Sequence, residues 1–392
     1  MVKVSVIIPV YNNEEYLSEA LDSVISQTLT DIEIICINDG STDSCPEILN
    51  DYSNKDSRFI VINQENQGSA ISRNTALDIA TGEYIAFLDA DDRYIDKKSL
   101  ELMYEAGIKN DASLVSANLK FLTQKRELID NPHYGKGTFY YFQKDCEINP
   151  DDYGIPFYFY KNLFEFDLIR DIRFPNLLRG QDPVFLSEVL GKTDRIYGVN
   201  VDFYGYMFPT TFSKLDTYTK KYHYILQYKQ CYTILNESRL KKTRDKYMHN
   251  LMMYLENNID SEVYDIVGEV FEDDLSYFKN YEREYLTFKS SNILNKILEK
   301  NTNDYFLKAK NELNDYDLNL NELEMLNKSD NISDYKIKFF TSKNESAKRQ
   351  YETLLKENND LKDELKKQEK LNSEIVNSKS WKMMNKIRKL RG

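Results

Sequence analysis

The strongest constraint on the fold is an alternation of apolar runs and helical patterns in the first 120 residues. Short runs rich in β-branched residues, such as VSVIIPV and IEIICIN, predict strands. The segments between them, such as EEYLSEALDSVIS, repeat apolar residues with the helical period. Strands that alternate with helices form a mainly parallel sheet covered on both faces. We therefore predict an α/β fold with strands at residues 4–10, 32–38, 59–63, 84–88 and 112–119.

Polar residues follow four of these predicted strands, at the points where the strands end. Ligands of parallel sheets bind outside the carboxyl ends of the strands. Turn chemistry explains any one of these polar groups, but it explains four of them on one edge poorly. In chain order, the candidate residues are Pro9, Tyr11 and Glu14, then Asp39, then Asn66, Gly68 and Arg73, and finally Asp89 and Asp91.

The fourth strand, YIAFL, runs directly into three carboxylates in the sequence DADD. Like charges this close need a cation, basic partners or solvent. Asp89 and Asp91 project to the same side of an extended segment and could face Mg²⁺ or Mn²⁺, which is typically held by one or two carboxylates plus substrate phosphates. Asp92 could instead cap or buttress the turn.

Two other residues have alternative interpretations. Asp39 could accept hydrogen bonds from a nucleotide base or a ribose hydroxyl, or it could belong to a β-turn in NDGS. Arg73 could pair with phosphate or with the acidic residues, or it could be a surface arginine on a helix.

Length and composition limit the classes of protein. A chain of 392 residues is expected to have two or three domains, and its formal charge of −12 argues against general nucleic-acid binding. The four cysteines are scattered without a CxxC pair, which favours reduced thiols in a cytoplasmic protein. No window approaches the roughly 18 apolar residues that a membrane-spanning helix needs.

Four segments together resemble one known family. VSVIIPVYNNEEYLSEALDSVISQT, INDGSTD, NQGSAISRNTAL and GEYIAFLDADD occur in this order, and with this spacing the chain resembles the family 2 glycosyltransferases. The resemblance covers about residues 3–120 and continues more weakly to 216. It implies a GT-A fold, a Rossmann-like three-layer α/β/α domain with a mainly parallel sheet. It also implies transfer of a sugar from a nucleotide diphosphate, with inversion at the anomeric carbon.

The resemblance assigns roles to the candidate residues. The donor is expected to be a UDP-sugar, and the acceptor a glycan or a lipid-linked molecule used in cell-surface polysaccharide or glycoconjugate synthesis. A divalent cation, Mn²⁺ or Mg²⁺, is the implied cofactor. By resemblance, Pro9, Tyr11 and Glu14 line the base and ribose, Asp39 holds the base, Arg73 lies near the diphosphate, and Asp89 and Asp91 hold the metal and the donor; Asn66 and Gly68 join them as substrate-binding candidates.

An inverting transfer needs a general base on the acceptor hydroxyl. The family's acidic pair at the start of a helix corresponds to Gln181 and Asp182 in RGQDPVF, so the first acid is replaced and the second is retained. Asp182 is therefore the predicted catalytic base, although Asp followed by Pro is also helix-cap chemistry. Lys161 resembles a family lysine near the acceptor side, or it is a plain surface lysine.

We predict three regions along the chain. Residues 1–216 form the catalytic domain, with a donor-binding half at 1–120 and an acceptor-binding half at 121–216. Residues 217–340 form a helical region without a motif. In the charged region 341–392, residues 345–375 are either a short coiled coil that could form a homo-oligomer or a solvated helix. The basic tail either contacts the inner face of a membrane peripherally or packs on the protein or a partner.

Two other functions are alternatives for such a chain. A nucleotidyltransferase would be expected to carry a Gly-rich basic loop near its N-terminus, where this chain has the acidic PVYNNEE. A non-catalytic transferase scaffold is disfavoured because Asp39, Asp89, Asp91 and Asp182 are all present. The sequence therefore predicts a metal-dependent, inverting glycosyltransferase.

Overall fold

A single mixed sheet organises the part of the chain that the computed structural model describes, residues 1–130, 141–207, 217–258 and 261–271. These residues fall within one unit, Met1–Ile297. The strand order is β3-β2-β1-β4-β9-β6-β10-β5, with β7 on β6 and β8 on β10. The strands are β1 (Val4–Val10), β2 (Ile32–Asn38), β3 (Phe59–Asn63), β4 (Tyr84–Phe87), β5 (Arg93–Tyr94), β6 (Leu114–Leu122), β7 (Leu128–Ile129), β8 (Cys146–Ile148), β9 (Asn162–Glu165) and β10 (Ile196–Met207).

The first four strands form the predicted parallel half of the sheet. β1 pairs with β2 and β4, and β2 pairs with β3, all in parallel. Every residue of β2 and β4 is buried, as expected for strands covered on both faces. The strand predictions for this half are confirmed to within a residue.

The second half of the sheet adds antiparallel strands that the repeating pattern did not indicate. β9 lies antiparallel between β4 and β6, so that Leu163 pairs with Ala86 on one side and Val115 on the other. β6 and β10 are parallel to each other. The α/β class is therefore confirmed, with a mixed sheet in which the parallel order is interrupted at β9.

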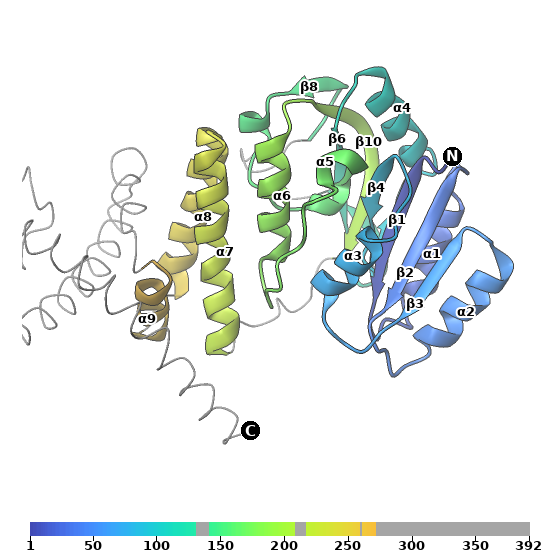
Figure 1. The fold of residues 1–392 in the computed structure, drawn as a ribbon, viewed down its shortest axis with the longest axis horizontal. Helices are drawn as coiled ribbons and strands as arrows, with labels where there is room; N and C mark the ends of the chain where they lie inside the picture. Colours follow the sequence, from blue (N-terminus) through green and yellow to red (C-terminus); the bar gives the residue numbers. More distant parts are fainter. Residues whose placement is uncertain (131–140, 208–216, 259–260, 272–392) are drawn as a thin grey trace, which may run out of the picture. The chain divides into compact units, whose positions relative to one another are not determined.

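Helices cover both faces of the sheet (Figure 1). α1 (Leu17–Ile25), α2 (Cys45–Lys55) and α4 (Ser99–Lys109) lie on one face, and α3 (Ser69–Leu77), α5 (Phe166–Ile169) and α6 (Gln181–Lys192) lie on the other. The side chain of Gln27, just after α1, accepts a hydrogen bond from Leu100 N of α4, which ties the first set together. The three layers match the predicted arrangement.

An aromatic cluster fills the core between the sheet and α6. The rings of Phe174 and Phe185 stack with their centroids 4.0 Å apart, and Phe87 of β4 contacts both edge-on. Phe159 and Phe164 complete the cluster, and all five side chains are buried. Much of the aromatic residue content of 141–207 therefore builds the core beneath the carboxyl ends of the strands.

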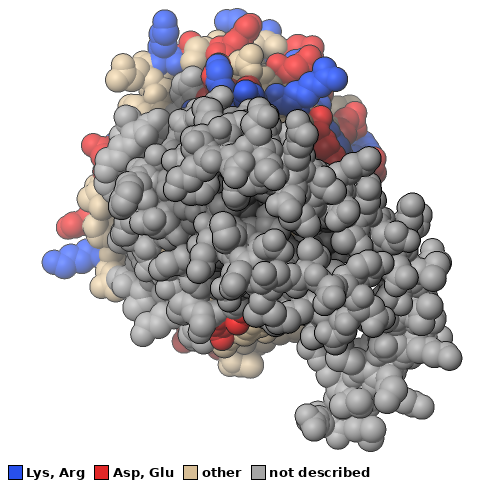
Figure 2. Space-filling model, turned by 90° about the vertical axis from the view of Figure 1, so that its left-hand side faces the viewer, with Lys and Arg blue, Asp and Glu red and all other residues tan. Residues whose placement is uncertain are grey.

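The described part of the predicted helical region consists of α7 (Tyr218–Glu237), α8 (Lys241–Asn258) and α9 (Ser261–Val270). No helix in the described ranges is long and apolar enough to cross a membrane. On the face drawn in Figure 2, described Lys and Arg side chains are interspersed with Asp and Glu. The predicted coiled coil at 345–375 and the basic tail lie outside the described residues.

Candidate functional site

Asp39, at the end of β2, organises the loop between β3 and α3. Its carboxylate accepts hydrogen bonds from the backbone N–H of Gln67 (2.9 Å) and Gly68 (2.7 Å) and from Gln64 Nε2 (2.7 Å). Gly68 precedes α3 with a φ of 91°, a conformation that suits glycine. Asp39 is only 3% exposed, so it fixes the shape of this loop rather than forming a simple solvent-exposed turn.

The other candidates from the first and third strands lie around this loop. Tyr11 is exposed directly after β1, whereas Pro9 lies within β1 beside Ile37. Glu14 accepts a hydrogen bond from Ser44 N at the start of α2, and its hydrogen bonds with Ser44 lower the pKa of its carboxyl. Asn66 is exposed, and its backbone N lies against Gly40, where an added Cβ would be 2.9 Å away.

Arg73 joins two of the predicted carboxylates. Its Nη2 donates to Asp89 Oδ1 at 2.6 Å, and its Nη1 lies 3.6 Å from Asp182 Oδ1. The guanidinium packs over the rings of Phe159 and Phe174, at 5.0 and 5.3 Å from their centroids. Arg73 is 4% exposed, so the surface interpretation is wrong and the pairing with acidic residues is confirmed.

Asp182 lies in the first turn of α6, the helix that begins at Gln181. Its Oδ1 is buried and accepts no hydrogen bond from any described residue, although Arg73 is within ion-pair distance. The side chain as a whole is 35% exposed. Burial raises the pKa of Asp182 to about 6, against the opposing charge of Arg73. The carboxyl group therefore titrates at a higher pH than an ordinary aspartate.

The turn after β4 is held by its third carboxylate, Asp92. Asp92 accepts hydrogen bonds from Tyr204 Oη (2.7 Å) and from Met207 N (2.6 Å), and Tyr204 Oη accepts from Asp89 N (3.0 Å). Asp92 is 1% exposed, and burial followed by the charges of Asp91 and Asp89 raises its pKa. The predicted buttressing role of Asp92 is confirmed, and β10 supplies its partners.

Asp91 differs from Asp89 and Asp92 because no other described residue forms a hydrogen bond or an ion pair with its carboxylate, whereas Asp89 pairs with Arg73 and Asp92 accepts from Tyr204 and Met207. Burial, and then the charge of Asp89, raise the pKa of Asp91 to about 6. The described residues contain no group of three or more His, Cys, Asp or Glu side chains arranged around one metal position. Asp89 and Asp91 fit a cation of the Mg²⁺ type, because such a cation is usually held by one or two carboxylates and completes its shell with substrate phosphates.

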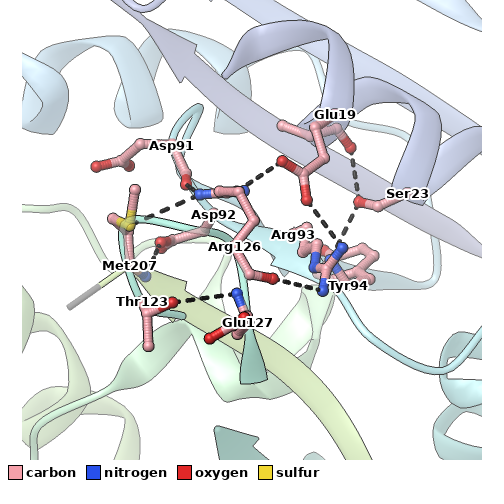
Figure 3. A network of polar contacts seen from close by, with 11 residues as sticks. Glu19, Ser23, Asp91, Asp92, Arg93, Tyr94, Thr123, Arg126, Glu127 and Met207 are labelled. Carbon is pink, nitrogen blue, oxygen red and sulfur yellow. Dashed lines mark hydrogen bonds and ion pairs between the residues drawn. The ribbon is translucent and has the colours of Figure 1, made fainter. Parts of the chain in front are cut away.

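Beside Asp91 lies a pair of arginines that the sequence did not suggest (Figure 3). Arg126, in the turn between β6 and β7, donates from Nη1 to Asp91 O at 2.8 Å and from Nε to Glu19 Oε2 at 2.6 Å. Arg93 donates to the other oxygen of Glu19 at 2.9 Å. The sequence TQKRE resembles an ordinary charged turn, so no local signal marked Arg126.

Lys161 lies apart from this cluster. It is 3% exposed, and its Nζ lies over the rings of Phe142 and Tyr153 at 5.2 and 5.6 Å. Burial lowers the pKa of Lys161 to about 7. The surface-lysine interpretation is wrong, and no described contact joins Lys161 to Asp89 or Asp182.

Comparison with known proteins identifies the domain that carries this cluster. Residues 5–166 match the model of glycosyl transferase family 2. Residues 5–166 are a family 2 glycosyltransferase domain. This chain is 43% identical to "Glycosyltransferase GlyA" of Streptococcus pneumoniae over 116 residues. The match covers 30% of this chain and 16% of that protein. This chain is also 43% identical to "Poly(ribitol-phosphate) beta-glucosyltransferase" of Bacillus spizizenii over 122 residues. That match covers 30% of this chain and 19% of the relative. The chain thus spans a minor part of these curated relatives.

Solved structures show that this glycosyltransferase domain has the predicted GT-A fold. The structure of S. aureus TarS 1-349 in complex with UDP has a TM-score of 0.62 and 18% identity, and the match covers 81% of this chain and 93% of that one. The complex of TarS 1-349 with UDP-GlcNAc gives a TM-score of 0.61 at 19% identity, covering 77% of this chain and 92% of that one. The GT-A assignment made from the sequence is confirmed.

Proposed function

We propose that this protein is an inverting glycosyltransferase that moves a sugar from a nucleotide-diphosphate donor to an acceptor hydroxyl. The observation that carries the proposal is the position of Asp182. Arg73 pairs with both this partly exposed carboxylate and Asp89, at the edge of the sheet where α/β proteins bind their ligands. Its raised pKa suits a group that must accept a proton.

In the proposed reaction, Asp182 accepts the proton of the acceptor hydroxyl as its oxygen attacks the anomeric carbon. The bond from that carbon to the diphosphate breaks on the opposite face, and the nucleoside diphosphate leaves with the electron pair. Arg73 holds Asp182 and Asp89 in fixed positions through its two Nη atoms. The family 2 domain and its curated glycosyltransferase relatives support this chemistry.

A UDP-sugar is the proposed donor. The neighbouring TarS structures hold UDP and UDP-GlcNAc, which supports a uracil nucleotide. Tyr11, Glu14 and Asn66 are exposed around the loop that Asp39 holds, and they are the residues proposed to contact the base and ribose together with Pro9 and Gly68.

A divalent cation, Mn²⁺ or Mg²⁺, is the proposed cofactor, with Asp89 and Asp91 as its protein ligands. When bound, the cation would supply positive charge to the diphosphate. The unpaired carboxylate of Asp91 and its raised pKa support this assignment, because a nearby cation would stabilise the charged form.

The proposed acceptor is a glycan or a lipid-linked molecule of the cell surface. The name of the B. spizizenii relative, a poly(ribitol-phosphate) glucosyltransferase, supports such an acceptor. Lys161 remains a candidate for the acceptor side. A nucleotidyltransferase would be disfavoured by the family match, and a non-catalytic scaffold by the retained Asp39, Asp89, Asp91 and Asp182.

The first test is nucleotide binding and donor turnover. Calorimetry with UDP and GDP, in Mn²⁺ and in EDTA, should show cation-dependent binding of one nucleotide. The variant Asp91→Ala should lose the cation dependence, while Asp171→Ala, which removes an exposed carboxylate, should not. Release of UDP or GDP from a panel of nucleotide sugars then identifies the donor. If neither nucleotide binds the wild type, the transferase proposal fails.

A further inference from the structure

Contacts with several segments of the chain fix the position of the Arg126 guanidinium. Nε donates to Glu19 of α1, Nη1 donates to the backbone O of Asp91, and the guanidinium lies over the ring of Tyr16 at 5.1 Å from its centroid. Nη1 also lies 3.7 Å from Met207 Sδ at the end of β10 (Figure 3). The backbone of Arg126 has a φ of 63°, which few non-glycine residues adopt. The tight turn thus brings a long cationic side chain directly to Asp91.

The two arginines of this network share a single acidic partner. Arg93 and Arg126 each donate to one oxygen of Glu19, so two positive charges meet one negative side chain. Asp91 is the neighbouring carboxylate, and the charge of Arg126 partly offsets the rise of its pKa. A guanidinium in such a position is well suited to bind an anion, since its planar donors match phosphate oxygens.

One donor of Arg126 is unused. Nη2 of Arg126 is buried and finds no hydrogen-bond acceptor among the residues that the structure describes. Buried donors are normally paired, and an unpaired one calls for a ligand or another specific explanation. An oxygen of a molecule that binds next to Asp91 would give Nη2 the acceptor that it lacks.

We propose that Arg126 binds the diphosphate of the nucleotide-sugar donor and stabilises it as the leaving group; this inference rests on the proposed function. The diphosphate gains negative charge as the bond to the sugar breaks, so a fixed cation at this position would favour the transition state. Glu19 is then a positioning residue, because it holds Nε and leaves Nη2 available.

The alternative is that Arg126 only ties the β6–β7 turn to α1. A comparison between a nucleoside and its diphosphate separates the two roles, because only the diphosphate carries the anion. The variants are Arg126→Met, which removes the charge, and Arg126→Lys, which keeps it without the planar donors. The control is Arg58→Met, because Arg58 is also partly buried and paired with a carboxylate, Asp56, before β3.

Calorimetry with UDP and uridine, and with GDP and guanosine, gives the readout. For the nucleotide that the wild type binds, Arg126→Met should weaken diphosphate affinity by on the order of 10- to 100-fold, as expected for loss of a charge-assisted hydrogen bond. Nucleoside affinity should remain unchanged, and Arg126→Lys should fall in between. The variant Arg58→Met should match the wild type.

Other outcomes would overturn the inference. If Arg126→Met binds UDP like the wild type, Arg126 does not contact the diphosphate, although the proposed function stands. If nucleoside and diphosphate affinities fall together, in Arg126→Met and in the milder Arg126→Lys, the role is structural. If the wild type binds neither nucleotide, the proposed function itself has failed, and this result is distinct from the first two.

Discussion

The two sides of the site are built by different means. In residues 1–120, Asp39 directly follows its strand and is held by a nearby loop, because it accepts hydrogen bonds from the N–H groups of the loop that begins α3. In the second half, Asp182 follows a turn that the distant helix α7 supports. Leu178 N donates to His223 Nδ1 at 2.9 Å, and Gly180 packs against the side chain of Gln227. The position of Asp39 on the proposed donor side thus depends on nearby sequence, and the position of the proposed base depends on long-range packing.

The largest effect is expected from Asp182→Asn, which tests the base on the packed side. An amide of the same shape cannot accept the proton, so the sugar-transfer rate should fall by about 10²- to 10⁴-fold. UDP affinity should change little, since Asp182 is proposed to act on the acceptor. Single-turnover kinetics with a donor identified by the panel measure the rate.

The matched control for this variant is Asp171→Asn, an exposed carboxylate in the loop before α6. It should keep the wild-type rate. An Asp182→Asn protein that retains more than a tenth of the wild-type rate would mean that another group is the base.

A smaller effect is expected from loosening the support of the same turn. Gln227 is fully buried, and its Oε1 accepts a hydrogen bond from Tyr247 Oη while its side chain lies against Gly180. Gln227→Ala should let the turn shift and lower the transfer rate by up to about 100-fold, because small displacements of a catalytic group are costly. UDP affinity should stay constant. Glu237→Ala changes an exposed residue of α7 and serves as control.

Gly180→Ala tests the same contact from the opposite side. Its φ of 79° is unfavourable for alanine, and its Cβ would lie 2.3 Å from Gln227 Cγ. It should lower the rate in the same way. If both variants keep the wild-type rate, α7 does not position Asp182, and the contrast between the two sides of the site is wrong.

The same contrast explains what the sequence could predict. The strand Val4–Val10 is continuous in apolar character, and a parallel strand covered on both faces needs little else. The run Asn162–Glu165 is only four residues long and becomes a strand because β4 and β6 provide partners on both sides. Its pairing depends on residues about 50 to 80 positions away, which no local period reports.

Side chains of the site divide in the same way. The position of Asp89 at a strand end was clear from YIAFLDADD, whereas the burial of Arg73 depends on Phe159 and Phe174 from the other half. The burial of Lys161 could not be predicted, because nothing near it in the sequence indicates the aromatic rings around it. Arg126 was missed for the same reason, since Glu19 lies more than 100 residues away.

The smallest effect is expected from pH, and it separates the two sides of the site. Asp182 must be ionised to accept a proton, and its pKa is raised to about 6, so the transfer rate should fall about tenfold per unit as pH drops well below 6. Asp91 has a pKa raised to a similar value, and cation binding also needs its charged form.

Saturating Mn²⁺ should therefore shift the part of the pH dependence that is due to Asp91 to lower pH, and it should leave the part that is due to Asp182 unchanged. Rate–pH profiles at low and saturating Mn²⁺ measure this difference, and the acidic limb that remains should be absent in Asp182→Asn. A limb that persists in that variant would assign the titration to the donor side.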